Sequence, residues 1–267
     1  MRNLEQIPFI WFWPNGASAA TIVAHDVETD AGIAFIPSMI DIGASFDIRS
    51  SFQLVPEGRY NVPTTLIDSI RKRPCEVNVH DLDHSGNLFG NRDRFLKKSK
   101  RFNKSLAAYG ADGFRAGCMY RNIDWCDQLR ISYDMSVPNV AHLEPQRGGS
   151  CTVFPYFIGN VLELPLTTIQ DYSLLNILGS YSIDLWKAQI ELILKRNGLL
   201  SFIVSRVYNG GARAQCIQKL AQPSYAPPPG EPNLVCPPWR GQSVVARTEC
   251  YGASGLSQLD RYYGCGG

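Results

Sequence analysis

Strand-like and helix-like segments alternate along most of this chain, and this order constrains its fold more than any other feature of the sequence. Apolar residues at helical spacing predict a helix over 64–73, and Pro74 ends it just before the strand-like stretch 76–80. Further helices are predicted over 92–109, 124–129 and 183–195, and further strands over 21–28, 34–47, 113–115, 131–134, 161–166 and 199–204. Strands joined through helices pair in parallel, so about seven of them predict an α/β fold, a distorted (β/α) barrel of parallel strands.

The predicted strands end in ionisable residues. In barrels of this kind the active site is built at the carboxyl ends of the strands. The residues at such ends are His25, Asp26, Glu28, His80, Arg115 and Asp134. We therefore expect these side chains to gather at one end of the barrel.

Two histidines lie four residues apart in the segment His80-Asp-Leu-Asp-His84. This spacing suits two ligands of one divalent ion, because both imidazoles can face the same side of a helix. A solvated turn is the alternative for this segment taken alone. A carboxylate of Asp26 or Glu28, at the end of the first strand, would complete a ligand set of two histidines and one acid. The sequence therefore predicts a metal site.

Four segments, in this order, resemble the motifs of the polysaccharide deacetylases of the NodB-homology type (carbohydrate esterase family 4): His25–Thr29, His80–His84, Gly113–Gly117 and Tyr133–Pro138. The resemblance covers about residues 10–204, and residues 1–204 would form the deacetylase-like domain. It implies a distorted barrel of seven strands and a divalent metal ion, for which zinc is expected. The implied activity is a metal-dependent hydrolase that removes acetyl groups from N-acetylated sugars or polysaccharides.

The resemblance also implies a role for each matching residue. Glu28, His80 and His84 would hold the ion, and Asp26 would be the general base. Asp26 is the alternative carboxylate ligand, because the commoner form of the motif has adjacent aspartates and Val27 separates the two acids here.

Arg115 and Asp134 would support the reaction. Arg115 would orient Asp26 and keep it ionised, since a nearby guanidinium favours the charged form of a carboxylate. We expect Arg115→Ala to cost no more stability than an exposed substitution. Asp134 would either orient a neighbouring group or cap the next turn.

The distribution of charge limits the partners. The chain has 26 basic and 24 acidic residues and a formal net charge of +2, without a long block of like charge. This pattern gives no support to a nucleic acid or a membrane surface as partner and favours a small or neutral molecule. The resemblance implies that this molecule is an N-acetylated sugar or polysaccharide. Scattered cysteines and the lack of a recognisable signal peptide predict a cytoplasmic location. A noncatalytic binder of metal or saccharide and a hydrolase of a non-sugar amide are the alternative functions.

The segment after the last predicted strand departs from the family pattern. The family places a histidine there that protonates the leaving amine, whereas here Val204 is followed by Ser205. A serine hydroxyl is no general acid near neutral pH, so the activity of the chain as written is expected to be impaired. Residues 205–267 hold half of the 8 cysteines and a Pro-Pro-Pro-Gly run, which predicts an irregular tail.

Codon degeneracy indicates that this tail is an out-of-frame translation. Residues 205–213 can be encoded as TCA AGA GTA TAT AAC GGA GGA GCG CGC, which reads QEYITEER when the frame moves one base forward. Completing the preceding codon as CAT supplies a histidine. The same shift over residues 233–247 permits IWCALPGEVKAWWRA, and the stretch between permits a segment with amphipathic helical spacing. We therefore predict that the true C-terminal segment is encoded in another frame.

Overall fold

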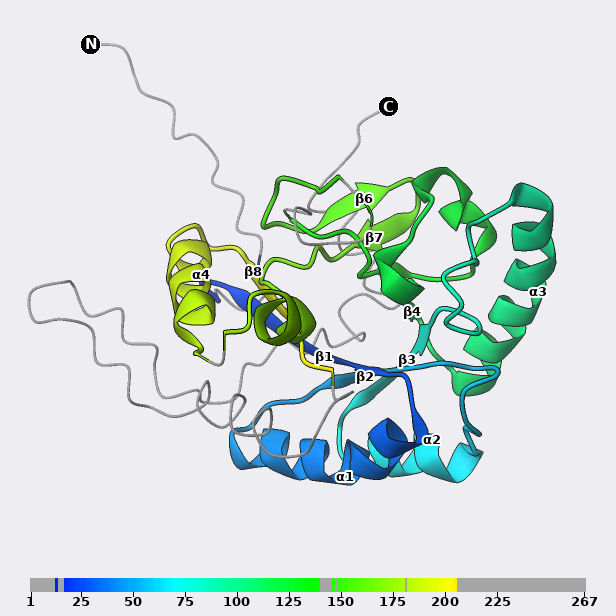
Figure 1. The fold of residues 1–267 in the computed structure, drawn as a ribbon, viewed down its shortest axis with the longest axis horizontal. Helices are drawn as coiled ribbons and strands as arrows, with labels where there is room; N and C mark the ends of the chain where they lie inside the picture. The colour runs from blue at the N-terminus through cyan, green and yellow to red at the C-terminus, as the bar shows by residue number, and fades with distance from the viewer. Residues whose placement is uncertain (1–12, 14–16, 140–145, 147, 181, 206–267) are drawn as a thin grey trace, which may run out of the picture.

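One curved sheet organises the protein. The structure is a computed structural model that describes residues 13, 17–139, 146, 148–180 and 182–205. Eight strands follow the order β6-β7-β5-β4-β3-β2-β1-β8, and neighbours are parallel except for the antiparallel pair β6 and β7. The strands are β1 (Ala20–Val27), β2 (Ser51–Leu54), β3 (Glu76–His80), β4 (Gly113–Arg115), β5 (Tyr133–Asp134), β6 (Tyr156–Ile158), β7 (Val161–Glu163) and β8 (Leu199–Ile203). The sheet forms a half-barrel (Figure 1), which confirms the predicted α/β fold with a mainly parallel sheet.

The segment 34–47, predicted as a strand, is instead most of helix α1 (Asp30–Ser45). The Thr29 side chain caps this helix by accepting a hydrogen bond from the Gly32 backbone N–H. Its buried residues recur at helical spacing: Gly32, Ile36, Met39, Ile40 and Gly43. The prediction was wrong because apolar residues also fill the positions between them, so the apolar run obscured the helical period. The parallel strand that follows is β2, which the sequence patterns did not single out.

The remaining helices form close to their predicted bounds. They are α2 (Thr64–Arg71), α3 (Arg92–Tyr109), α4 (Asp184–Leu194) and the 3₁₀ helix η3 (Ile123–Gln128). Helix α3 begins after Asn91, whose side chain accepts hydrogen bonds from two backbone N–H groups of the first turn. It ends at Gly110, which takes a left-handed φ of 55°. The 3₁₀ turn η2 (Gly117–Met119) and the π-helical turn η4 (Ser173–Ile177) complete the described elements.

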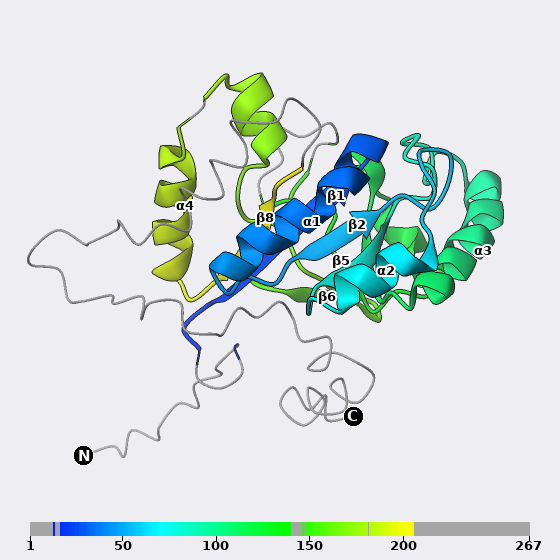
Figure 2. The same ribbon diagram turned by 90° about the horizontal axis from the view of Figure 1, so that it is seen from below.

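The hydrophobic core lies between the sheet and the helices that cover it. Helices α1 and α2 lie along one side of the sheet, α3 lies beside β3, and α4 lies beside β8 (Figures 1 and 2). Phe102 of α3 and Phe114 of β4 are both fully buried, and their rings meet edge to face with 5.2 Å between centroids. Trp186 of α4 packs in the same way against Phe202 of β8. These contacts fix the strands, and therefore the positions of the strand ends.

The register of the strands brings the ionisable residues to one end of the half-barrel. His80 is paired with Arg115 across β3 and β4, and Asp134 with Glu163 across β5 and β7. Asp26 is the penultimate residue of β1. All of these residues lie at the carboxyl ends of parallel strands, as the alternation of strands and helices predicts.

Some predictions concern residues that the structure does not describe. The predicted tail lies outside the described residues apart from Ser205, and so does the start of the chain before Trp13. Among the described helices, none combines the length and the apolar character needed to cross a membrane.

Candidate metal centre and active site

Glu28, His80 and His84 form a compact group of possible metal ligands. Their ligand atoms all lie within 4.8 Å of one another. Glu28 Oε1 is 3.2 Å from His84 Nε2 and 3.7 Å from His80 Nε2. Both Nε2 atoms are buried, and neither has a hydrogen-bond partner among the described residues. Two unsatisfied imidazole nitrogens beside one carboxylate are a donor set that fits a divalent ion such as zinc.

Asp26, the alternative carboxylate ligand, lies at the border of this group. Its Oδ2 is 3.9 Å from His80 Nε2. The Glu28 carboxylate is nearer to His80 and also reaches His84, so the geometry favours Glu28 as the ligand. Asp26 would be close enough to act on a molecule held beside an ion bound by this group.

The backbone and its hydrogen bonds orient the two histidines. His80 Nδ1 lies 3.1 Å from the Arg115 carbonyl oxygen, a contact that directs Nε2 toward Glu28. The segment from His80 to His84 is a turn rather than a helix, and His84 has a φ of 51°. In this turn the two imidazole centroids lie 4.6 Å apart. Arg59 also donates a hydrogen bond of 3.0 Å to the His84 carbonyl oxygen.

Asp81 connects this turn with the loop after β4. Its carboxylate accepts a 2.7 Å hydrogen bond from the Leu82 backbone N–H, and the residue is 1% exposed. A Cβ atom on Gly117 would lie only 2.5 Å from Asp81 Oδ2. Gly117, in the third motif, therefore lets the loop after β4 approach the turn that carries His84.

The neighbouring ionisable groups shift the pKa values of Glu28 and His80. Burial alone raises the pKa of Glu28, but the neighbouring imidazoles of His80 and His84 outweigh it and hold this pKa well below its usual range. Burial lowers the pKa of His80, but the charges of Asp26 and Glu28 outweigh it and the net shift is upward. The acids thus create a negative field that favours positive charge at this point.

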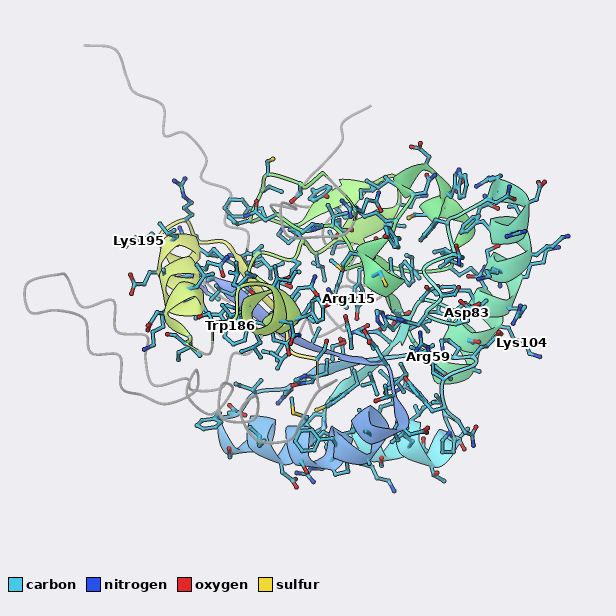
Figure 3. The ribbon with its side chains drawn as sticks, in the orientation of Figure 1. Arg59, Asp83, Lys104, Arg115, Trp186 and Lys195 are labelled. Atoms are coloured by element: carbon cyan, nitrogen blue, oxygen red, sulfur yellow. The ribbon has the colours of Figure 1, made fainter. Side chains whose placement is uncertain are left out.

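Arg115 is fully buried and faces Asp26. Its Nε lies 3.4 Å from Asp26 Oδ1, and the side chain is 0% exposed. Figure 3 shows Arg115 in the middle of the molecule, away from the outer helices. The expectation that Arg115→Ala costs no more stability than an exposed substitution does not fit this burial, because truncation would leave a buried carboxylate without its cation.

Asp134 lies at the end of β5 and is linked to the loop of Arg115. Its Oδ1 accepts a hydrogen bond from Ser136 Oγ, and Ser136 Oγ accepts a 2.8 Å hydrogen bond from the Ala116 backbone N–H. These contacts support the orienting role over that of a turn cap. Glu163 lies beside Asp134 and was missed by the sequence motifs; its one signal is an acid within the apolar run Val161–Leu166.

Ser205 follows the end of β8, beside the end of β1. The Val204 backbone N–H donates a 3.0 Å hydrogen bond to the Ala24 carbonyl oxygen, and the Val204 carbonyl oxygen lies 2.8 Å from His25 Nδ1. Burial lowers the pKa of His25 to about 4, so its imidazole is neutral near pH 7. His25 thus joins the two strands at the point where β8 ends and Ser205 follows.

Tyr60 is a further residue that the motifs did not identify. Its hydroxyl donates to the Val27 carbonyl oxygen and accepts a 2.8 Å hydrogen bond from the Val55 backbone N–H. Burial raises the pKa of Tyr60 well above its usual range. Tyr60 is therefore a neutral hydroxyl that ties the loop after β2 to the end of β1.

Comparisons with known proteins give structural matches. No family model matches the sequence, and no curated protein matches it significantly. A candidate polysaccharide deacetylase from Mycobacterium smegmatis is similar with a TM-score of 0.54 and 17% identity, over 79% of this chain and 87% of that chain. The peptidoglycan deacetylase PdaC from Bacillus subtilis gives a TM-score of 0.46 and 12% identity, over 76% of this chain and 83% of that chain. The chitin deacetylase from Colletotrichum lindemuthianum gives a TM-score of 0.39 and 13% identity, over 69% of this chain and 85% of that chain.

At these identities the likeness concerns the fold. The structure of the Mycobacterium smegmatis protein carries that conclusion, since its similarity spans most of both chains. The parallel half-barrel, with its ionisable residues at the carboxyl ends of the strands, agrees with it. The chain therefore has the NodB-like fold of the polysaccharide deacetylases.

Proposed function

We propose that this chain is a metal-dependent hydrolase that removes the acetyl group from an N-acetylated sugar or polysaccharide. The reaction breaks a carbon–nitrogen bond that is not a peptide bond. The convergence of Glu28, His80 and His84 within 4.8 Å, with Asp26 beside them, is the observation that carries this proposal. This site supports the function more strongly than the fold does, because a fold by itself does not fix a function.

Each residue of the site has a distinct task. Glu28, His80 and His84 would hold the ion, and zinc suits two imidazoles and one carboxylate. The bound ion would supply Lewis-acid polarisation of the acetyl carbonyl and acidify a water molecule. Asp26 accepts the proton of the attacking water. Arg115, 3.4 Å from Asp26, holds that carboxylate in place.

The leaving amine must receive a proton before it departs. Ser205 follows β8 at the position where a general acid is needed, and its hydroxyl cannot supply a proton near neutral pH. We propose that the chain as written turns over poorly. Reading residues 205–267 in the other frame would place a histidine directly after Val204 and restore the reaction.

Ser205 also favours one alternative, a noncatalytic protein that binds metal or saccharide without hydrolysing it. A hydrolase of a non-sugar amide is the other alternative. Acetate release from chitin oligomers and peptidoglycan fragments, with an allantoin-type amide as comparison, separates these functions. The assay is run on the chain as written and on a chain with the restored frame, each loaded with zinc.

Two variants assign roles in the same assay. Asp26→Asn is expected to keep the zinc stoichiometry and to abolish acetate release, whereas His84→Ala is expected to lose zinc. Asp30→Asn is the matched control, because Asp30 is an exposed acid at the start of α1. Loss of zinc from Asp26→Asn would make Asp26 a ligand instead of the base, and acetate release by neither chain would refute the proposed activity.

A further inference from the structure

The β2–α2 loop (residues 55–63) contacts both of the segments that carry the candidate metal ligands. The Tyr60 hydroxyl donates a hydrogen bond to the Val27 carbonyl oxygen at the end of β1. Arg59 Nη2 donates a 3.0 Å hydrogen bond to the His84 carbonyl oxygen. Two consecutive residues of one loop therefore bind the backbone beside two different ligands.

The Tyr60 contact restrains the backbone that leads to Glu28. The Val27 carbonyl belongs to the peptide unit that joins Val27 to Glu28, and this unit is planar, so a hydrogen bond to its oxygen restricts the direction in which Glu28 leaves β1. The Tyr60 hydroxyl is itself held, because it accepts a 2.8 Å hydrogen bond from the Val55 backbone N–H. Val55 is fully buried and directly follows β2. The start of the Glu28 residue is thus tied to β2 as well as to β1.

The Arg59 contact restrains the backbone that follows His84. His84 has a φ of 51°, and a residue with a side chain keeps this conformation only when its surroundings hold it there. The hydrogen bond from Arg59 to the His84 carbonyl oxygen is one contact that does so. Arg59 Nη2 also lies 3.4 Å from His84 Nδ1. With Nε2 as the ligand atom, Nδ1 carries the ring proton and cannot accept, so the bond to the carbonyl is the one that holds the turn.

The loop is anchored independently of these two contacts. The Glu57 backbone N–H donates a 3.0 Å hydrogen bond to the Leu82 carbonyl oxygen, in the middle of the turn that carries the histidines. The Glu57 carboxylate accepts a 3.0 Å hydrogen bond from Arg101 Nε of α3. Gly58 then takes a φ of 79°, which a residue without a side chain adopts at no steric cost. The loop is therefore fixed to α3 and to the histidine turn before it reaches Arg59.

The separation of Glu28 and His84 fits one ion. Glu28 Oε1 lies 3.2 Å from His84 Nε2. Two ligand atoms at tetrahedral positions, each about 2.0–2.2 Å from zinc, lie roughly 3.4 Å apart. A small rotation of either backbone would move these atoms out of that range, so their common support by one loop bears directly on metal binding.

We propose that Arg59 and Tyr60 are positioning residues of the candidate metal centre. Tyr60 holds the backbone before Glu28, and Arg59 holds the backbone after His84. The β2–α2 loop, which carries both, sets the separation of the two ligands. This inference rests on the proposed function, in which Glu28 and His84 bind the same ion.

Zinc titration calorimetry of the full chain tests the two contacts. Tyr60→Phe removes only the hydroxyl, and Arg59→Met removes the donor but keeps a long side chain. Each should weaken zinc binding about 10-fold, an effect typical of residues that orient metal ligands. Arg59→Lys keeps a donor and should bind zinc more tightly than Arg59→Met. Wild-type affinity in either Tyr60→Phe or Arg59→Met would overturn the role of that residue.

A spectrum separates positioning from a general loss of stability. The visible absorption of cobalt(II), bound in place of zinc, depends on the arrangement of its ligands. At saturating cobalt the absorption bands should shift in Tyr60→Phe and Arg59→Met and return toward the wild type in Arg59→Lys. Bands that stay unchanged in both variants would contradict the positioning role.

Matched controls remove the same groups from exposed positions. Tyr172→Phe lies at η4, where Tyr172 is 50% exposed, and Arg73→Met lies after α2, at an exposed ion pair with Asp41. Both should keep the zinc affinity and the cobalt spectrum of the wild type. A weakening in these controls equal to that in Tyr60→Phe and Arg59→Met would contradict the inference.

These measurements need no turnover, so the inference and the proposed activity can fail separately. A wild type that binds zinc and releases no acetate would refute the activity, and the loss of affinity in the variants would still support the inference. A wild type that releases acetate while Tyr60→Phe and Arg59→Met keep full zinc affinity would refute the inference alone. A wild type that binds no zinc would overturn both.

Discussion

The close approach of Gly117 to Asp81 predicts that a single methyl group will disturb the candidate metal centre. In Gly117→Ala the new Cβ would lie 2.5 Å from Asp81 Oδ2 and 3.1 Å from Asp81 Cβ. Both separations are inside the ~3.5–4.0 Å at which non-bonded carbon atoms make favourable contact. Asp81 is 1% exposed and is hydrogen-bonded to the Leu82 backbone, so it can move only together with the turn that carries His84.

Two quantities follow from this overlap. Overpacking of a buried site costs about 1–3 kcal/mol, so the free energy of unfolding should fall by that amount. Displacement of His84 should weaken zinc binding by roughly 10–100-fold, the effect typical of disturbed ligand orientation. Urea denaturation of the metal-free protein measures the first quantity, and zinc titration calorimetry measures the second.

Gly90→Ala is the matched control for this experiment. Gly90 lies in the loop that follows the same turn, and the nearest atom to its added Cβ is Asn87 Oδ1 at 3.5 Å, an ordinary contact. It should bind zinc as the wild type does. If Gly117→Ala and Gly90→Ala have the same stability and the same zinc affinity, the steric reasoning is refuted.

Four further predictions concern charge, pH, packing and the reading frame. Arg115→Ala should destabilise the protein by about 3–5 kcal/mol in urea denaturation because it leaves a buried carboxylate unpaired, and a loss below 1 kcal/mol would contradict this burial. The pKa of His25 is 6.5 in the unfolded chain and about 4 in the folded chain. The free energy of unfolding should therefore decrease by about 3 kcal/mol in total as pH falls through that window. In His25→Gln, urea denaturation should show a smaller decrease over the same window. Trp186→Ala should cost about 3–5 kcal/mol, since the side chain is 1% exposed and its indole N–H donates to the Ile169 carbonyl oxygen at 2.7 Å. Sequencing the coding DNA should show codons that permit the alternative frame after Val204. Inserting the two bases CA there should give a soluble chain that releases acetate. A verified reading frame, or good turnover by the chain as written, would defeat this prediction.

Several elements could be predicted because their signals are local. Asn91 and Gly110 set the ends of α3, since one side chain caps the first turn and one residue without a side chain adopts the left-handed φ that ends the last. The strand β3 has its predicted bounds, and it ends at His80. The strand predicted over 34–47 was wrong, because an apolar run within one segment does not distinguish a buried strand from a buried helix.

The sequence by itself determined the order of strands and helices and the chemical types at the strand ends, because periodicity, caps and motif spacing are properties of neighbouring residues. Those signals also indicated that Asp26, Glu28, His80 and Arg115 would lie at one end of a parallel sheet. The tertiary structure alone decided that Glu28 lies nearer the histidines than Asp26 does, that Arg115 is fully buried, and that Glu163 is paired with Asp134. Each of these depends on distances between different strands, which the register and the packing of the sheet set and the spacing along one segment does not.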